Sequence, residues 1–303
     1  MRPRIVTIGG GNGQSELLRA LRGVDAYVTA IVTVMDSGGS SGILRKDRGI
    51  PAVGDVRRCL AALIGPEQEQ EWNGRDTDGH ALGNLIIADE IQKKKSMTTA
   101  LASLGHALGA TGTVLPVTEE PVDLCAELMS HEIIIGEGVI DAPDVSIAGT
   151  LARMYLEPVA HVTREVVDAV RAADCIVLTM GDLYTSIVPN LLVQGVVHAL
   201  EGRKATSTLV YVCNRSTKSG ETDGFSVADY VDELHRYIQP VTLDVVLFDS
   251  SSVVVPAGYE RVKDNDQLSD SLRIIRDDFV DDTATQFVSG EKVAQTLLTL
   301  CTS

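Results

Sequence analysis

The residues best suited to bind a phosphate lie near the N-terminus, in a glycine-rich turn. The turn follows an apolar run at residues 4–8, typical of a buried strand, and precedes a helical pattern from 14 to about 22. Glycines let a backbone approach a phosphate closely, and the N-terminus of the next helix offers N–H donors and a favourable dipole. We expect phosphate binding here, with a packing turn as the alternative. The turn residues are Gly9, Gly10, Gly11, Asn12 and Gly13.

A second glycine-rich turn follows the next predicted strand, residues 27–34. The carboxyl ends of parallel strands meet at the edge of the sheet where open α/β folds bind ligands, so both turns are expected to face one ligand. Asp36 could accept a hydrogen bond from a ribose hydroxyl or bind Mg²⁺. The residues after it could hold phosphate, and a surface loop is the alternative. They are Gly38, Gly39, Ser40 and Ser41.

Charged and amide side chains further along could complete such a site. Asp55 is a candidate N-cap, and Arg57 or Arg58 could supply a cation for the phosphate, unless both arginines are simply solvated. Asn84 shares a helix face with His80, but a lone histidine is more often structural than catalytic.

Two later strands also end in polar turns, at residues 180–190 and 214–224. Their short polar side chains could bind a base, a sugar or a divalent ion, and long ordered turns are the alternative. The candidates are Tyr184, Asn190, Asn214, Thr222 and Asp223.

Composition and missing motifs limit the possible functions. The formal charge of −16 argues against nucleic-acid and anionic-membrane partners. The five cysteines are dispersed and have no metal-site spacing. No GxGxxG fingerprint, P-loop, GxSxG elbow, HExxH pair or CxxC motif occurs, so no catalytic residue is assigned. The first residues resemble neither a signal peptide nor an anchor, and we expect a cytoplasmic protein.

Strand-length apolar runs alternate with helical patterns along most of the chain. This predicts an α/β fold, Rossmann-like and doubly wound, with a mostly parallel sheet. We expect one domain over residues 1–303, with a helical insertion at about 55–110 and a small β-hairpin from strands at 122–128 and 133–140. Helices at 188–200, 264–275 and 289–300 are also expected, the last two closing the fold over about 264–303.

Taken in order, the motifs resemble the gluconeogenesis-factor family, which is related to 2-phospho-L-lactate transferase. The matching segments are 9–13, 36–42, 54–57, 80–84, 183–190 and 220–224. The resemblance implies a Rossmann-like core and a nucleotide or nucleotide-sugar ligand, typically a UDP-sugar, with roles in carbon metabolism, cell-wall growth and cell shape. The transferase branch moves a phospholactyl-type group from a nucleotide diphosphate donor with Mg²⁺.

Three departures from the family pattern bear on the ligand. Ser37 stands where a second aspartate is usual, which weakens an Mg²⁺ site at Asp36. Asp182 lies in a turn where the family has glycine and serine, and it would repel a phosphate that it faced. An arginine expected before the last helix is missing near Phe287.

Three functions are open at this point. The first is a ligand-sensing regulatory protein that binds a nucleotide sugar, associates with a protein partner and forms homo-oligomers. The second is an Mg²⁺-dependent transferase that uses Asp36. The third is an NAD-binding dehydrogenase, which lacks the fingerprint spacing and an evident proton donor.

Overall fold

A seven-stranded parallel sheet forms the centre of the computed structural model, which describes residues 2–142, 144–264, 272–281 and 287–302. The strand order is β10-β9-β8-β7-β1-β2-β3, and the adjacent pairs are parallel. The strands are β1 (Arg4–Gly9), β2 (Tyr27–Val32), β3 (Thr113–Pro116), β7 (Cys175–Leu178), β8 (Thr208–Val212), β9 (Val245–Asp249) and β10 (Arg273–Asp277). Their Val- and Ile-rich sequences suit a sheet that is buried on both faces.

The chain reverses its direction of travel across the sheet at β1. It moves outward from β1 to β2 and β3, and then returns to β7, which pairs with the other side of β1. Such a reversal is the topological switch point of a doubly wound sheet, and ligands bind outside the carboxyl ends of the strands at this point. The predicted fold class is confirmed.

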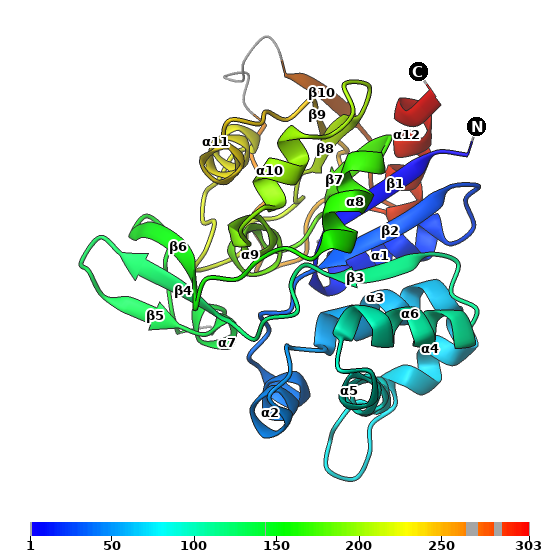
Figure 1. Cartoon of the computed structure of the whole chain (residues 1–303). Coiled ribbons are helices and arrows are strands. Elements are labelled where there is room, and N and C mark those ends of the chain that lie inside the picture. Colours follow the sequence, from blue (N-terminus) through cyan, green and yellow to red (C-terminus); the bar gives the residue numbers. More distant parts are fainter. Residues whose placement is uncertain (1, 143, 265–271, 282–286, 303) are drawn as a thin grey trace.

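Helices cover both faces of this sheet (Figure 1). One layer consists of α1 (Gly11–Leu21), α3 (Gly54–Ile64) and α12 (Gly290–Thr302), in which α1 packs against the other two. The opposite layer consists of α8 (Arg164–Ala172), α9 (Val188–Leu192), α10 (Val196–Glu201) and α11 (Val227–Ile238). The connection between β2 and β3 is helical and contains α2 (Gly39–Arg48), α3, α4 (Pro66–Asn73), α5 (Leu82–Lys94) and α6 (Met97–Ala107).

The predicted hairpin is present, but it belongs to a three-stranded antiparallel sheet. Its strands are β4 (Asp123–Leu128), β5 (Ile133–Ile135) and β6 (Leu151–Glu157), in the order β5-β4-β6. The strand predicted at 133–140 ends early, because Gly136 has a φ of 100° and turns the chain into the short helix α7 (Glu137–Ile140). This turn brings α7 next to the turn after β2, where the N–H of Gly138 donates to the Ser37 hydroxyl.

Two other predicted elements were wrong. The helix predicted at 188–200 is not continuous, because it is interrupted between α9 and α10, and a π-helical turn (Leu183–Ile187) precedes it. The helix predicted at 264–275 is contradicted by β10, whose β-branched Ile274 and Ile275 pair with β9, while residues 265–271 lie outside the described part. The final helix, predicted at 289–300, is confirmed as α12.

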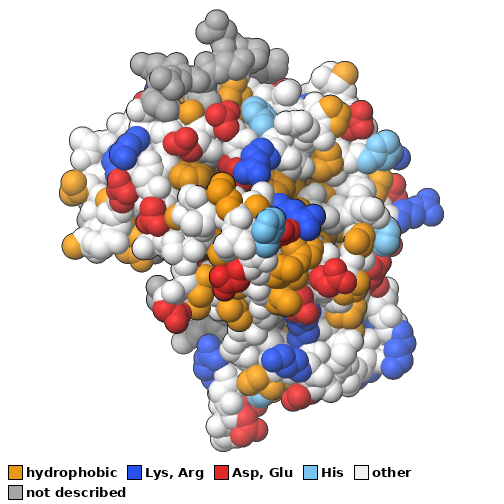
Figure 2. Space-filling view, turned by 90° about the vertical axis from the view of Figure 1, so that its left-hand side faces the viewer, with side chains coloured by type: hydrophobic (Ala, Val, Ile, Leu, Met, Phe, Trp, Pro, Cys, Tyr) orange, Lys and Arg blue, Asp and Glu red, His pale blue; other side chains and the backbone are white. Residues whose placement is uncertain are grey.

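The small sheet exposes apolar side chains on its outer strand. Ile133 and Ile135 in β5 are 51% and 58% exposed, and the neighbouring Val139 is 50% exposed. Figure 2 faces this side of the molecule and shows hydrophobic side chains gathered between charged ones. In the described part of the chain, the helices are too short or too polar to cross a bilayer.

Candidate functional site

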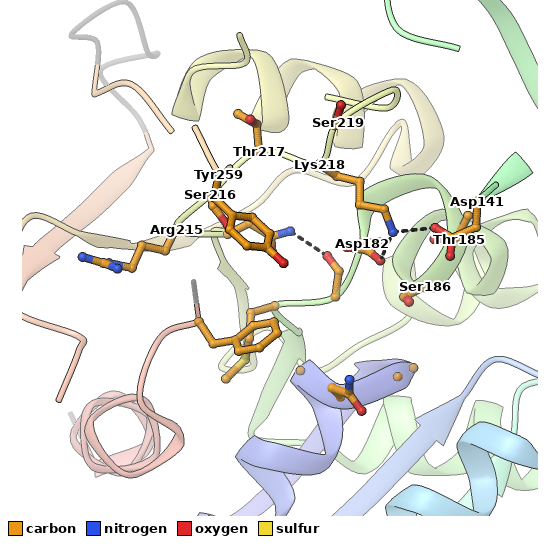
Figure 3. A pocket seen from close by; sticks show the side chains of 18 of the residues that line it. Asp141, Asp182, Thr185, Ser186, Arg215, Ser216, Thr217, Lys218, Ser219 and Tyr259 are labelled. Carbon is orange, nitrogen blue, oxygen red and sulfur yellow. Dashed lines mark hydrogen bonds and ion pairs between the residues drawn. The ribbon is translucent and has the colours of Figure 1, made fainter. Parts of the chain in front are cut away.

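A cavity of about 990 Å³ opens at the carboxyl ends of β1, β7 and β8, at the switch point of the sheet. Its walls come from segments that are far apart in the sequence. They are the N-terminus of α1, the turn after β2, the start of α3, α7, the turn after β7, the loop after β8 and residues 258–260 and 287–288. Figure 3 shows side chains from several of these segments directed toward one space.

The first glycine turn forms the start of α1, three residues before the predicted helix start. Gly10 is the N-cap, and Gly11 has a φ of 63°, which favours glycine. A Cβ on Gly13 would lie 1.8 Å from the carbonyl oxygen of Met180, so this contact leaves no space for a side chain. The turn therefore packs tightly against the segment after β7, and it also presents a helix N-terminus to the cavity.

Three carboxylates face the cavity next to this turn: Asp36, Asp55 and Glu137, here called the Asp36 cluster. Asp36 accepts the N–H of Gly38 at 2.8 Å, and Asp55 pairs with Arg58 at 2.7 Å. Burial raises the pKa of Asp55 further than Arg58 lowers it, and the charge of Asp36 adds to the increase. Burial, followed by the charge of Asp36, raises the pKa of Glu137 to about 8.

Ser37 connects α7 to the turn after β2. Its hydroxyl accepts the N–H of Gly138 at 2.8 Å, and its own N–H donates to Glu137 at 3.4 Å. The residue that replaces the expected second aspartate thus holds a glutamate from another segment beside Asp36. The three side chains offer oxygen atoms, the type of ligand that Mg²⁺ prefers, and Mg²⁺ would neutralise phosphate charge if it bound there.

On the other side of the cavity, Lys218 is directed toward Asp141 and Asp182 (Figure 3), and a third carboxylate lies close to it. Its Nζ is 2.5 Å from Asp141, 2.9 Å from Asp182 and 3.8 Å from Glu221. These four residues are here called the Lys218 cluster. Burial lowers the pKa of Lys218, but the nearby carboxylates, Asp182 first, raise it more, so the net shift is upward and the ammonium stays charged. Asp182 therefore faces the cavity as a paired charge.

The loop that carries Lys218 is held by its own hydrogen bonds. The backbone N–H of Lys218 donates to Thr222 Oγ1 at 2.9 Å, and that hydroxyl contacts the hydroxyl of Tyr230 at 2.9 Å. Asn214, at the start of the loop, donates to the carbonyl oxygen of Gly181 at 2.9 Å. The loop after β8 is thus fixed against the turn after β7.

Half of the residues that the sequence nominated line the cavity. They are Gly10, Gly11, Asn12, Gly13, Asp36, Gly38, Asp55, Asn214 and Asp223. The other nine nominated residues do not line the cavity. They are Gly9, Gly39, Ser40, Ser41, Arg57, Asn84, Tyr184, Asn190 and Thr222.

Most of the polar residues in the second set bind other protein groups. Arg57 donates to Asn84 Oδ1 at 3.0 Å, and Asn84 donates to Ser40 Oγ at 3.1 Å. The Ser41 hydroxyl accepts the N–H groups of Val53 and Gly54, and so anchors the start of α3. The Arg57 guanidinium is thus directed into the helical region, and it is Arg58 that lines the cavity.

Asn190 supports the glycine turn from behind. It is fully buried and donates to the carbonyl oxygens of Gly9, at 3.0 Å, and Ser186, at 2.8 Å. These bonds join the end of β1 to the π-helical turn.

Sequence reasoning did not nominate several cavity residues. These are Glu137, Asp141, Lys218 and the exposed aromatic residues Tyr259 and Phe287. Lys218 carried a usable signal, because it is a cation in a polar turn after a strand of an acidic protein. The others come from segments without a strand–turn–helix pattern, so only the tertiary fold brings them here.

The fold and the cavity define a Rossmann-like α/β protein with a large cavity at its switch point. Residues 5–280 match the family model described as 2-phospho-L-lactate transferase CofD, and the chain belongs to this family. It is 39% identical to the putative gluconeogenesis factor of Thermotoga maritima, over 82% of this chain and 79% of that protein. It is 38% identical to the gluconeogenesis factor of Bacillus subtilis, over 83% and 80%.

A solved structure agrees with this assignment. The crystal structure of a Bacillus halodurans protein superposes with a TM-score of 0.90 at 33% identity, and the match covers 98% of this chain and 100% of the other.

Proposed function

We propose that this protein binds a nucleotide sugar of the UDP-sugar type in the 990 Å³ cavity and acts as a regulatory protein. The observation that carries the proposal is the cavity itself, because it lies at the switch point of the sheet and contains the glycine turn and the N-terminus of α1. The relatives named gluconeogenesis factor support a role linked to carbon metabolism. The resemblance extends the proposal to control of the cell wall and cell shape, in the cytoplasm.

The lining residues suggest how such a ligand would lie. The residues from Gly10 to Gly13 suit the phosphates, because they line the cavity, Gly11 and Asn12 are not buried, and the dipole of α1 favours a negative charge. Asn214 and Asp223 offer polar contacts to a base or sugar, and the ring of Tyr259 offers an apolar surface. In this proposal, Arg58, Lys218 or a bound Mg²⁺ balances the phosphate charge against the acidic walls.

An Mg²⁺-dependent transferase remains the alternative, and the Asp36 cluster is the observation in its favour. Asp36, Asp55 and Glu137 could hold a metal beside a nucleotide diphosphate, and the matching family model carries a transferase name. NAD is the third ligand to test. A regulatory protein partner and homo-oligomerisation stay predictions.

The test is a thermal-shift screen with UDP-glucose, GDP and NAD, each with and without Mg²⁺, because a ligand that binds the native state raises the melting temperature. A shift with UDP-glucose supports the proposal. An Mg²⁺-dependent shift with GDP alone would replace it with the transferase.

An Asn12→Asp variant tests where the ligand binds. Asn12 is exposed in the first turn of α1 and lines the cavity. An added carboxylate there favours the helix through its dipole but repels a phosphate, so we expect a stable protein without the ligand shift. Thr99→Asp adds the same charge to the first turn of α6, outside the cavity wall, and should keep the shift. An unchanged shift in Asn12→Asp would mean that the phosphates bind elsewhere.

A further inference from the structure

The three carboxylates of the Lys218 cluster have the spacing of a cation site. One oxygen each from Asp141, Asp182 and Glu221 lies within 4.8 Å of the other two. Divalent cations such as Mg²⁺ and Ca²⁺ bind carboxylate oxygens at about 2.0 to 2.6 Å, so oxygens with this spacing can share one ion. The residues come from three segments: the end of α7, the turn after β7 and the loop after β8.

Glu221 is the unusual member of the cluster. It is 3% exposed, and neither of its carboxylate oxygens has a hydrogen-bond partner within the described part of the chain. Its nearest cation is Lys218 Nζ at 3.8 Å, which is beyond hydrogen-bond distance. Burying an ionised carboxylate without hydrogen-bond donors lowers the stability of the folded protein, so Glu221 requires a positively charged partner when it is ionised.

Lys218 alone does not neutralise the cluster. Three carboxylates and one ammonium carry a formal charge of −2 when all are ionised. The lysine is also closer to Asp141 and Asp182 than to Glu221. Burial raises the pKa of Glu221 to about 8, with Asp182 as the second cause, so Lys218 does not offset the cost of ionising this residue.

We propose that Asp141, Asp182 and Glu221 form a binding site for a divalent cation and that the Lys218 ammonium occupies it in competition with the ion. Lysine suits this role because its side chain is a flexible stem with one compact charge, and Lys218 also lines the open cavity into which the ammonium can move. The site is separate from the Asp36 cluster and shares no residue with it.

The competition makes Lys218→Met the decisive variant. Removing the ammonium changes the formal charge of the site from −2 to −3 and vacates its centre. We expect Mn²⁺ to bind at least about tenfold more tightly than to the wild type, since a like charge a few Å away is removed. Electron paramagnetic resonance of free Mn²⁺ measures this affinity without any nucleotide, so the result is independent of the proposed function.

Three controls assign the effect to this site. Lys204→Met removes a lysine that pairs with Asp174 outside the cavity wall, and it should leave Mn²⁺ binding unchanged. Glu221→Gln in the Lys218→Met background should abolish the gain, and Asp36→Asn in that background should preserve it. Circular dichroism melting confirms that each variant is folded.

The proposal is overturned if folded Lys218→Met binds Mn²⁺ no more tightly than the wild type. It is also overturned if Asp36→Asn removes the gain or Glu221→Gln leaves it intact. In those cases a proton on Glu221, rather than a metal ion, supplies the missing charge.

Discussion

The Asp36 cluster and the Lys218 cluster contain three carboxylates each and both contribute to the wall of the same cavity, but their negative charge is balanced differently. In the Asp36 cluster much of the compensation comes from the backbone: Asp36 accepts the N–H of Gly38 and Glu137 accepts that of Ser37, and Arg58 pairs with Asp55. In the Lys218 cluster the compensation comes from one ammonium on a long side chain.

This difference separates a fixed site from an exchangeable one. Backbone donors cannot leave as a side chain can, so Asp36 and Glu137 are held more firmly than the partners of Lys218. A lysine can exchange a carboxylate partner for another anion, because its charge is on a flexible stem. An anionic ligand therefore meets a rigid acidic wall on one side and an adaptable one on the other.

The largest effect is expected from breaking the contact that holds the two clusters in one cavity. Gly13→Ala places a Cβ 1.8 Å from the carbonyl oxygen of Met180, so α1 and the turn after β7 must separate. We expect a loss of about 3 kcal/mol in the free energy of unfolding, measured by urea denaturation. Gly23→Ala is the matched control, since its Cβ would meet nothing within 4 Å. Equal stability of the two variants would contradict this close contact.

The strand–turn–helix parts of the site could be predicted from the sequence. Gly10 to Gly13 and Asp36 follow buried strands, and parallel strands bring their carboxyl ends to one edge whatever the rest of the fold does. The reversal at β1 then places the turn after β7 beside them. Pattern and topology were sufficient for this half of the cavity.

The remaining parts depended on tertiary packing that no local pattern encodes. Glu137 reaches Asp36 because Gly136 ends β5 and turns α7 inward, where a continuous strand was expected. Arg57 and Asn84 were good polar candidates, but they bind each other in the helical region. A sequence shows that a polar side chain is present, and only the fold shows whether its partner is a ligand or another residue.

A smaller effect tests the fixed cluster through its pH dependence. The pKa of Glu137 is about 8, raised by burial and then by Asp36, and an unfolded glutamate titrates near 4.3. Between these two pH values, Glu137 is ionised in the unfolded chain but still protonated in the folded one, so a rise in pH favours unfolding. The contribution of protonated Glu137 to the free energy of unfolding is therefore complete below about pH 4 and is lost as the pH rises to 8. Glu137→Gln removes this loss.

We therefore expect Glu137→Gln to be more stable than the wild type by on the order of 2 kcal/mol at pH 8, and equal to it at pH 4. Urea denaturation at both pH values, in buffer with a metal chelator, measures the difference. Glu132→Gln changes an exposed glutamate beside β5 and should have no comparable effect. A gain that does not depend on pH would show that repulsion within the cluster is not its cause.

The smallest effect tests the exchangeable cluster. Asp182→Asn removes the charge of one of the two closest partners of Lys218. The Lys218 ammonium then gives up a weaker attraction to its own cluster when it moves to contact a phosphate of the ligand. We expect UDP-glucose to bind about threefold more tightly without Mg²⁺, which corresponds to about 0.6 kcal/mol. Isothermal titration calorimetry measures it, and the gain should shrink as salt screens the charges.

Asp174→Asn separates this local effect from the loss of one negative charge anywhere on an acidic protein. Asp174 pairs with Lys204 outside the cavity wall, so its removal should leave the affinity for UDP-glucose unchanged. If both variants gain equally, the benefit comes from the net charge, and Lys218 does not turn to the ligand. If only Asp182→Asn gains affinity for UDP-glucose, the ligand must break the ion pair between Lys218 and Asp182. That same ion pair cancels the repulsion that Asp182 would otherwise exert on a phosphate. The Lys218 cluster would then exchange its cation for a ligand, whereas the Asp36 cluster keeps its backbone hydrogen-bond donors.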